Sequence, residues 1–274
     1  MTTRLFAVAG DPVAHSLSPV MQNAAIAALG LDARYVAART TARAFPSLVH
    51  EMLADGGGLN VTMPFKLQAA ELASDVTDAV RRTGACNTLW GDADRPSGDN
   101  TDVAAIAEAI RRLAPRARRI RVVGTGGSAR ATAVALVQVA PACALEVGSR
   151  SVERARAFAT WAAGLGLATS IWRPETLDDL DLLVLATPDP NTKQAKEDGE
   201  PDSEFTPIVR ALLDLRYARG GTVMVQAATI GLRIPAEDGR GVLVSQGAAS
   251  FERFFGVAAP VDVMRKAVED ALRP

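Results

Sequence analysis

The chain of 274 residues is long enough for one large domain or two ordinary ones, and either arrangement can bury a substantial core. Its apolar content of 48% and charged content of 22% are typical of a globular protein and exclude a disordered chain. The formal net charge of -1 gives no indication of a nucleic-acid or membrane partner, and two cysteines are too few for a disulfide framework or a zinc site.

The N-terminal segment lacks the long apolar core of a signal peptide. Elsewhere, no apolar run approaches the length of a membrane span. We therefore expect a cytoplasmic protein with reduced thiols and no bound metal, either a monomer or a homodimer.

Short apolar runs alternate with helical patterns along the chain, which predicts an α/β protein. In the first hundred residues the patterns predict strands at 5–10, 33–38 and 58–63 and a helix at 45–54. Another helix is expected to begin at Ser18 as its N-cap, with Pro19 in the first turn, and to end at Gly30 as its C-cap. These elements predict a first domain of mixed α/β type.

A long alanine-rich helix is expected after Asp102, and from there the pattern changes. Strand, glycine turn and helix follow one another at 119–138, and further strands are predicted at 144–150 and 181–188, with a helix at 152–164. The polar stretch at 189–203 is expected to be an exposed loop, and the tail from Gly247 onward to be helical. The alternation predicts a second, nucleotide-type domain, but it does not say on which domain the last helices pack.

The turn at 124–129 has the composition of a dinucleotide site. Gly124, Gly126 and Gly127 lie between a predicted strand and helix, with Ala129 where a third glycine often stands. Small residues there allow a tight turn, a close approach of backbone N–H groups to a pyrophosphate, and close packing of helix on strand. The N-terminus of the following helix favours the anion.

The end of the next predicted strand favours NADP over NAD. NAD sites commonly place an acidic residue there, whereas this chain has Arg150, which suits the 2′-phosphate of NADP through charge-assisted hydrogen bonds. Arg154 lies one helical turn further on and can assist. NAD stays open as the alternative, with Glu146 as its ribose ligand.

Polar residues interrupt the apolar segments of the first domain. The stretch "GLNVTMPFK" begins as a buried strand, turns at a proline and ends at Lys66. Asp102 stands directly ahead of a helix and is open to two interpretations, an N-cap or a functional carboxylate. Beside a nicotinamide, a lysine and an aspartate can exchange the proton that accompanies hydride transfer. The scattered hydroxyl and amide groups suit a pocket for a polyhydroxylated ligand.

Taken in order, these motifs resemble those of the shikimate dehydrogenase family, which includes the quinate/shikimate dehydrogenases. The resemblance covers almost the whole chain and is carried by "GDPVAHSLSPVMQN", "NVTMPFK", "GACNTL", "GDNTD", "GTGGSARA", "SRSVERA", "DLRY" and "SQGAASFERFFG". It implies a substrate-binding and catalytic domain at 1–102 plus 238–274 and a Rossmann-type NADP-binding domain at 103–237. The C-terminal helices would then return to the first domain.

The resemblance also implies an activity and a set of site residues. The activity is the NADP-dependent reversible reduction of 3-dehydroshikimate to shikimate, with Lys66 and Asp102 as the catalytic pair. The implied substrate-binding residues are Ser16, Ser18, Asn60, Thr62, Asn87, Tyr217 and Gln246. The implied cofactor-binding residues are Gly124, Thr125, Gly126, Gly127, Ser128, Ala129, Ser149, Arg150, Ser151, Arg154, Thr187 and Gly239.

Two alternatives stay open. One is a quinate or aminoshikimate dehydrogenase of the same family, and the other is a non-catalytic NADP-binding regulatory protein. The chain departs from the family pattern at Gln22, where many members have histidine, and at Val242, where methionine is common. It departs again at 185–191 ("LATPDPN") and at 217–219 ("YAR"). These departures indicate a divergent branch and leave the predicted catalytic groups in place.

Overall fold

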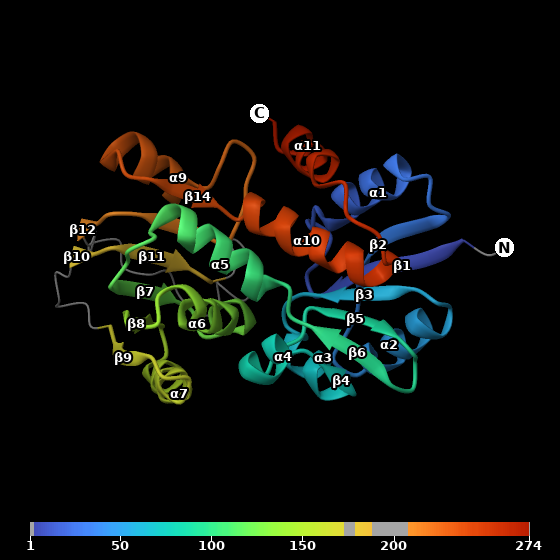
Figure 1. The fold of residues 1–274 in the computed structure, drawn as a ribbon, viewed down its shortest axis with the longest axis horizontal. Helices are drawn as coiled ribbons and strands as arrows, with labels where there is room; N and C mark the ends of the chain where they lie inside the picture. The colour runs from blue at the N-terminus through green and yellow to red at the C-terminus, as the bar shows by residue number, and fades with distance from the viewer. Residues whose placement is uncertain (1–2, 173–178, 188–207, 274) are drawn as a thin grey trace. The chain divides into compact units, whose positions relative to one another are not determined.

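A computed structural model describes residues 3–172, 179–187 and 208–273 of the chain. The loop predicted at 189–203 lies outside these residues, as does the end of the segment at 185–191. The chain forms two compact units, residues 1–105 with 243–274 and residues 106–242 (Figure 1). Each unit has its own six-stranded sheet, which confirms the predicted α/β class.

The sheet of the first unit is mixed, in the strand order β2-β1-β3-β5-β6-β4. Its first three strands in the chain run parallel, and β3 pairs antiparallel with β5. The strands are β1 (Arg4–Gly10), β2 (Ala33–Arg39), β3 (Gly58–Val61), β4 (Asp75–Val76), β5 (Thr88–Gly91) and β6 (Pro96–Asp99). Because β3 lies between β1 and β5, all four of its residues are buried.

The C-terminal helices pack on this first sheet, as the family resemblance implied. Phe251 of α10 and Met264 of α11 are fully buried in one apolar cluster with Phe6 of β1 and Met21 of α1. Burial of this apolar surface is what holds the chain's two ends together. The helices of this unit are α1 (Ser18–Ala28), α2 (Phe45–Ala54), α3 (Lys66–Leu72), α4 (Asp78–Thr83), α10 (Arg240–Phe255) and α11 (Val261–Ala271).

The start of α1 differs from the prediction. Leu17 is its N-cap residue, and Ser18 is already the first helical residue, so the expectation of Ser18 as N-cap is wrong. The hydroxyl of Ser16 accepts a hydrogen bond from the Ser18 N–H at 3.2 Å and satisfies a donor at this helix end. At the other end Leu29 is the C-cap, and Gly30 follows it in the left-handed region at φ 60°.

The sheet of the second unit is fully parallel, in the order β14-β13-β11-β7-β8-β9. Numbered along the chain, this is the 3-2-1-4-5-6 order of dinucleotide-binding sheets, with the switch point between β7 and β11. The strands are β7 (Arg119–Val123), β8 (Ala144–Gly148), β9 (Ala168–Ile171), β11 (Leu182–Leu185), β13 (Leu212–Asp214) and β14 (Ala236–Asp238). A separate two-stranded sheet consists of β10 (Asp179–Leu180) and β12 (Ile208–Val209).

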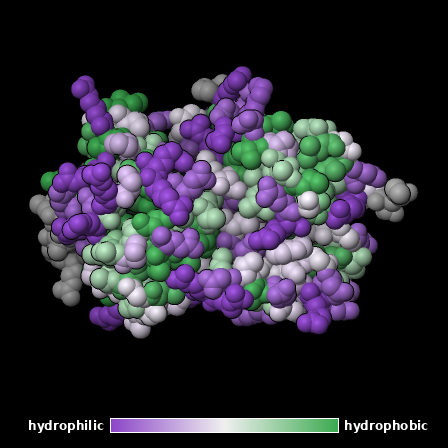
Figure 2. Space-filling model, viewed as in Figure 1, coloured by the Kyte–Doolittle hydropathy of each residue, from purple (hydrophilic) through white to green (hydrophobic). Residues whose placement is uncertain are grey.

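Helices accompany these strands, because a parallel sheet must be covered on both faces. They are α5 (Asp102–Leu113), α6 (Gly127–Val139), α7 (Val152–Ala163), α9 (Val223–Gln226) and a π-helical segment η1 (Ala227–Leu232). Figure 2 shows hydrophobic residues on the surface in the region of α9. Val223 of α9 and Ile230 of η1 are 79% and 78% exposed. Within the described ranges, every helix is too short or too polar to cross a membrane.

Candidate active site

Lys66 is positioned by the turn between β3 and α3. After β3, the N–H of Thr62 donates to the carbonyl of Ala9 at 2.8 Å, and the N–H of Phe65 donates to that of Thr62 at 3.0 Å. Lys66 is the first residue of α3, and its carbonyl accepts from the N–H of Cys86 at 2.8 Å. The turn is therefore anchored to β1 on one side and to the loop before β5 on the other.

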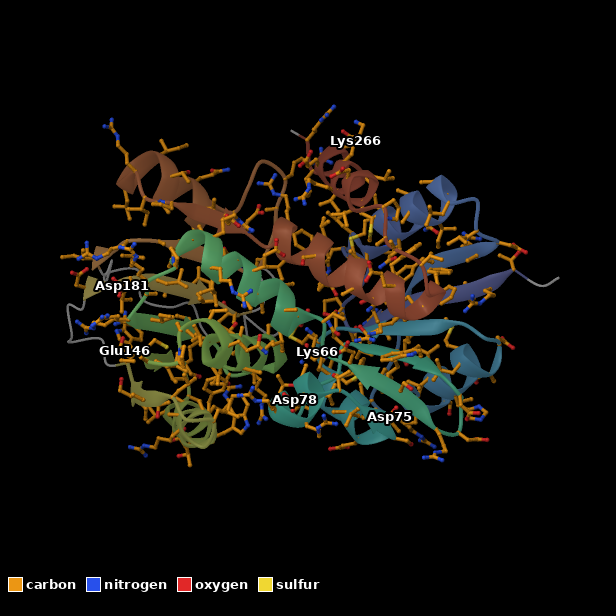
Figure 3. All side chains as sticks on the ribbon, viewed as in Figure 1. Lys66, Asp75, Asp78, Glu146, Asp181 and Lys266 are labelled. Carbon is orange, nitrogen blue, oxygen red and sulfur yellow. The ribbon has the colours of Figure 1, made fainter. Side chains whose placement is uncertain are left out.

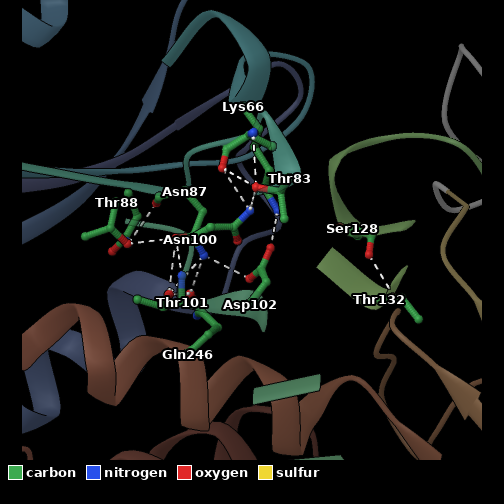
Figure 4. A network of polar contacts seen from close by, with 12 residues as sticks. Lys66, Thr83, Asn87, Thr88, Asn100, Thr101, Asp102, Ser128, Thr132 and Gln246 are labelled. Carbon is green, nitrogen blue, oxygen red and sulfur yellow. Dashed lines mark hydrogen bonds and ion pairs between the residues drawn. The ribbon is translucent and has the colours of Figure 1, made fainter. Parts of the chain in front are cut away.

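Lys66 and Asp102 form an ion pair. The Nζ of Lys66 lies 2.6 Å from Oδ2 of Asp102, and the two side chains are 14% and 11% exposed (Figure 4). Asp102 is the first residue of α5, where the helix dipole favours a carboxylate. This short charge-assisted contact holds a lysine ammonium in one place beside solvent, so Asp102 does more than begin a helix.

Asn87 contacts the other oxygen of the same carboxylate. Its Oδ1 accepts from the backbone N–H of Thr101 at 2.9 Å, and because that group can only donate, the orientation of the amide is determined. Its Nδ2 therefore donates to Oδ1 of Asp102 at 2.9 Å. Gln246 of α10 completes the group, with its Oε1 3.5 Å from Nδ2 of Asn87. Lys66, Asn87, Asp102 and Gln246 are thus brought together from four segments of the first unit.

Asn60 lies next to this group, and both the oxygen and the nitrogen of its side-chain amide hydrogen-bond to other protein groups. Its Oδ1 accepts from the hydroxyl of Tyr35 at 2.7 Å, while its Nδ2 donates to the carbonyl of Asn87 at 3.1 Å and to Oγ of Ser250 at 2.8 Å. The residue is only 6% exposed. Asn60 therefore supports the loop that carries Asn87, and its role in substrate binding stays a prediction.

The remaining predicted substrate residues lie in different places. Ser16 and Thr62 are half-buried and Ser18 is buried, all in the first unit. Tyr217 follows β13 and belongs to the second unit. Gln22, one of the departures from the family pattern, is fully buried, and its Nε2 donates to the carbonyl of Gly247 at 2.9 Å. In this chain that position links α1 to α10.

Both cysteines of the described chain are free and buried. Burial raises the pKa of the Cys86 thiol to about 12 and that of Cys143 to about 11. Each therefore stays a neutral thiol at neutral pH, and Cys86 contributes to the active-site region through its backbone contact with Lys66.

The glycine turn of the second unit lies at the switch point of its sheet. Gly124 has φ 123°, and an added Cβ would lie 2.6 Å from the carbonyl oxygen of Ala186, which follows β11. Gly126 is the N-cap of α6 with φ -83°, and an added Cβ there would meet no atom within 4 Å. Ala129 is fully buried, as close packing of α6 requires. The space in front of Gly126 and the α6 N-terminus fit a pyrophosphate.

We expect these two glycines to respond differently to alanine. Gly124→Ala should lower the free energy of unfolding by about 2–4 kcal/mol, because it combines positive φ with a backbone clash. Gly126→Ala should change the free energy of unfolding by less than about 0.5 kcal/mol. It should nevertheless weaken NADP binding about ten-fold, because the added methyl group fills the open space. Denaturant unfolding and calorimetric titration with NADP separate the two effects. Unchanged NADP affinity in Gly126→Ala would show that the pyrophosphate does not bind at this turn.

Serines shape the loop between β8 and α7. Ser151 is the N-cap of α7, accepting from the N–H of Arg154 at 3.2 Å, and the N–H of Ser151 donates to Oγ of Ser149 at 3.3 Å. Both Arg150 and Arg154 are exposed. Arg150 in this loop and Arg154 in the first turn of α7 thus place two guanidinium groups near the N-terminus of that helix.

The alternative of Glu146 as a ribose ligand loses support. Glu146 lies inside β8, and its carboxylate pairs with Arg121 of β7, with Nε 2.6 Å from Oε2 (Figure 3). Arg121 is 3% exposed, so this carboxylate neutralises a buried cation.

Thr187 and Gly239 lie at the carboxyl ends of other strands of the same sheet. Thr187 is half-buried just after β11. An added Cβ on Gly239 would lie 2.2 Å from the carbonyl oxygen of Leu215, so glycine permits a close approach of two backbone segments there. A structural need for Gly239 therefore exists independently of any cofactor.

Three polar residues that hydrogen-bond around Asn87 are not among the predicted site residues, although two of them, Thr88 and Thr101, belong to the motifs "GACNTL" and "GDNTD". Thr88, Thr101 and Ser250 are 0%, 4% and 0% exposed and all hydrogen-bond within it. One signal was available for Ser250, since it stands four residues after Gln246 and so on the same face of a helix.

The parallel sheet with a glycine turn at its switch point defines a dinucleotide-binding α/β protein. The lysine–aspartate pair adds groups able to transfer a proton, a combination typical of nicotinamide-dependent oxidoreductases.

Comparison with known proteins identifies the family. Residues 8–89 match the family described as the shikimate dehydrogenase substrate binding domain, and residues 239–269 match the shikimate 5'-dehydrogenase C-terminal domain. Shikimate dehydrogenase (NADP(+)) of Synechocystis sp. is 35% identical, with 97% of this chain and 95% of the relative covered. That of Geobacter metallireducens is also 35% identical, with 99% and 98% covered. The chain belongs to the shikimate dehydrogenase family.

Solved structures agree with this assignment. Shikimate 5-dehydrogenase from Thermus thermophilus in complex with shikimate is 30% identical, with a TM-score of 0.81 and 98% of each chain covered. The same protein in complex with NADP(H) and shikimate has a TM-score of 0.80, with 98% of this chain and 99% of that one covered.

Proposed function

We propose that this protein catalyses the NADP-dependent, reversible reduction of 3-dehydroshikimate to shikimate. The Lys66–Asp102 ion pair at 2.6 Å is the observation that carries the proposal, because reduction of a ketone needs a proton donor at its oxygen. The curated relatives are named NADP-dependent shikimate dehydrogenases, and the Thermus structure is a complex with NADP(H) and shikimate. The corresponding pathway is aromatic amino acid biosynthesis through chorismate, in the cytoplasm.

In this proposal the two predicted domains, whose bounds lie within five residues of those of the compact units, have separate roles. Residues 1–102 with 238–274 bind substrate and carry the catalytic pair, and residues 103–237 bind NADP. The mixed sheet with the polar group around Asn87 supports the first role. The parallel sheet and its glycine turn support the second.

The bound nicotinamide would supply the hydride chemistry. Lys66 donates a proton to the carbonyl oxygen of 3-dehydroshikimate in reduction and takes a proton from the hydroxyl of shikimate in oxidation. Asp102 holds the ammonium in place through Oδ2, and Asn87 holds the carboxylate through Oδ1. Each reduction leaves Lys66 as a neutral amine, which takes a proton back from solvent before the next turnover, and each oxidation releases one proton to solvent.

The substrate contacts follow the chemistry of the side chains. Ser16 and Ser18, in the segment that starts α1, bind the substrate carboxylate. The hydroxyls of the substrate contact or lie beside Asn60, Thr62, Asn87, Tyr217 and Gln246. A site built to hydrogen-bond hydroxyls rejects analogues that lack them, because its own polar groups are then left unpaired.

The cofactor contacts are the turn and the loop of the second unit. The turn at 124–129 holds the pyrophosphate, and Thr187 and Gly239 lie along the nicotinamide side. Ser149, Arg150, Ser151 and Arg154 surround the 2′-phosphate, supported by the exposure of both arginines.

Arg150→Gln is expected to raise KM for NADP about 10- to 100-fold, the effect of losing a hydrogen bond to a charged group. KM for NAD should stay within about two-fold, since NAD has no 2′-phosphate. Arg156→Gln is the matched control, because Arg156 is an exposed arginine of α7, six residues further along the chain. An equal rise in KM for NADP and for NAD would show that Arg150 does not bind the 2′-phosphate.

Substrate choice is tested by initial rates that cross shikimate, quinate and aminoshikimate with NADP and NAD. The proposal predicts the highest kcat/KM for shikimate with NADP. A preference for quinate or aminoshikimate would leave the mechanism intact and change the substrate. NADP binding without turnover of any of the three would favour a regulatory protein instead.

A further inference from the structure

A chain of buried hydroxyl and amide groups lies behind the catalytic pair in the first unit. Thr88 of β5 and Ser250 of α10 are both fully buried. Ser250 stands on the helix face that also carries Phe251 and Phe254 into the apolar core. A hydroxyl in such surroundings costs free energy unless it is hydrogen-bonded, so its contacts call for an explanation.

The hydroxyl of Ser250 joins three segments. Its Oγ accepts from Nδ2 of Asn60 at 2.8 Å, and its one proton can be donated to Oγ1 of Thr88 or to the carbonyl of Gln246, each 3.0 Å away. The bond to Thr88 takes this proton, because the proton of Thr88 is donated to Asn87. Asn60 is in turn held at its other end by the hydroxyl of Tyr35. Ser250 therefore fixes where the Thr88 hydroxyl sits relative to β3 and α10.

The hydroxyl of Thr88 in turn hydrogen-bonds to the side chain of Asn87. Its Oγ1 donates to Oδ1 of Asn87 at 2.9 Å, alongside the backbone N–H of Thr101 at 2.9 Å (Figure 4). The last torsion of an asparagine side chain is broad, so a single hydrogen bond leaves it mobile. The hydroxyl of Thr101 also donates to this oxygen at 3.2 Å. Three donors converging on one oxygen confine the amide plane, and the opposite end of that plane donates to Asp102.

We propose that the hydroxyls of Thr88 and Ser250 are positioning groups that set the amide plane of Asn87 and, through it, the carboxylate that holds Lys66. The kinetic part of this inference rests on the proposed function. Neither hydroxyl contacts Lys66 or Asp102 in any hydrogen bond between described residues, so both act through Asn87. The path from Ser250 Oγ to Lys66 Nζ runs through Thr88, Asn87 and Asp102.

The kinetic test uses variants that differ by a hydroxyl alone. Thr88→Val, which keeps the shape, should lower kcat for shikimate oxidation about ten-fold, and Ser250→Ala about three-fold, the loss expected from one neutral hydrogen bond. Thr88→Ser keeps the hydroxyl and should restore most of kcat. The double variant should lose less than the product of the single losses, because both act on one amide. KM for NADP should stay within about two-fold in all of them.

A purely structural role is distinguished by a control. Thr169 of β9 donates to the carbonyl of Ala159 at 3.1 Å in the second unit, outside the polar chain. Thr169→Val should lower the unfolding midpoint and leave kcat unchanged at temperatures where the protein stays folded. If Thr88→Val behaves in the same way, with a lower midpoint and wild-type kcat, the positioning role is overturned.

A second readout needs no turnover. With ¹⁵N-labelled asparagine, the side-chain amide protons of Asn87 should exchange slowly in wild type, and at least about ten-fold faster in Thr88→Val and Ser250→Ala. Unchanged exchange in both variants would overturn the inference even if kcat fell. Should wild type fail to oxidise shikimate with NADP, the proposed function fails, and the exchange rates alone still decide whether the hydroxyls position Asn87.

Discussion

Lys66→Met is expected to lower kcat for shikimate oxidation by about a thousand-fold, within the range of general acid–base catalysis. The reason is that the Nζ of Lys66 is the proton donor and acceptor proposed at the substrate oxygen, and methionine keeps the length of the side chain without an ionisable group. NADP affinity should stay within about two-fold, since the cofactor binds in the other unit. Stopped-flow or steady-state rates and calorimetric titration measure the two quantities.

Lys266 provides the matched control for this change. It lies on α11 with its side chain 70% exposed, and it pairs with Asp270 on the same helix surface (Figure 3). Lys266→Met should retain wild-type kcat. A Lys66→Met protein that is folded, binds NADP and retains more than about a tenth of wild-type kcat would remove Lys66 from the proton transfer.

Asp102→Asn is expected to lower kcat about a hundred-fold or more. In the native site two donors, Nζ of Lys66 and Nδ2 of Asn87, point at the two carboxylate oxygens. An amide has one oxygen, so one of these donors would face an NH₂ group. The ammonium of Lys66, 14% exposed, would also lose its counter-ion.

Asp78 offers a control at an equivalent place in a helix. It is the first residue of α4, as Asp102 is of α5, and its side chain is 70% exposed. Asp78→Asn should leave kcat unchanged. If Asp102→Asn also keeps wild-type kcat, the ion pair is a structural contact and Lys66 acts without it.

Much of the fold could be predicted from local patterns. The succession of strand, glycine turn and helix, the Rossmann-type fold of the second domain and the return of the C-terminal helices were expected, and they are confirmed. The short strands β4 and β6 were not predicted, because "DV" is only two residues long and "PSGD" contains both proline and glycine.

The polar network behind the catalytic pair could not be predicted in the same way. Asn60 and Ser250 are 190 residues apart in sequence, and their contact depends on the packing of α10 against the first sheet. Local patterns also misjudged the start of α1. Leu17 is the N-cap, so Ser18 is the first helical residue, and the hydroxyl of Ser16 accepts a hydrogen bond from the N–H of Ser18. The motifs name side chains, and only the tertiary fold says which of them share hydrogen bonds.

The most direct test of the account is the oxidation of shikimate by NADP with the purified protein, followed by the absorbance of the reduced cofactor and by NMR of the product. The account predicts turnover that yields 3-dehydroshikimate, one NADPH formed per shikimate consumed. It also predicts that 3-dehydroshikimate and NADPH run the reaction back. If the protein binds NADP but neither oxidises shikimate nor reduces 3-dehydroshikimate, the account is contradicted.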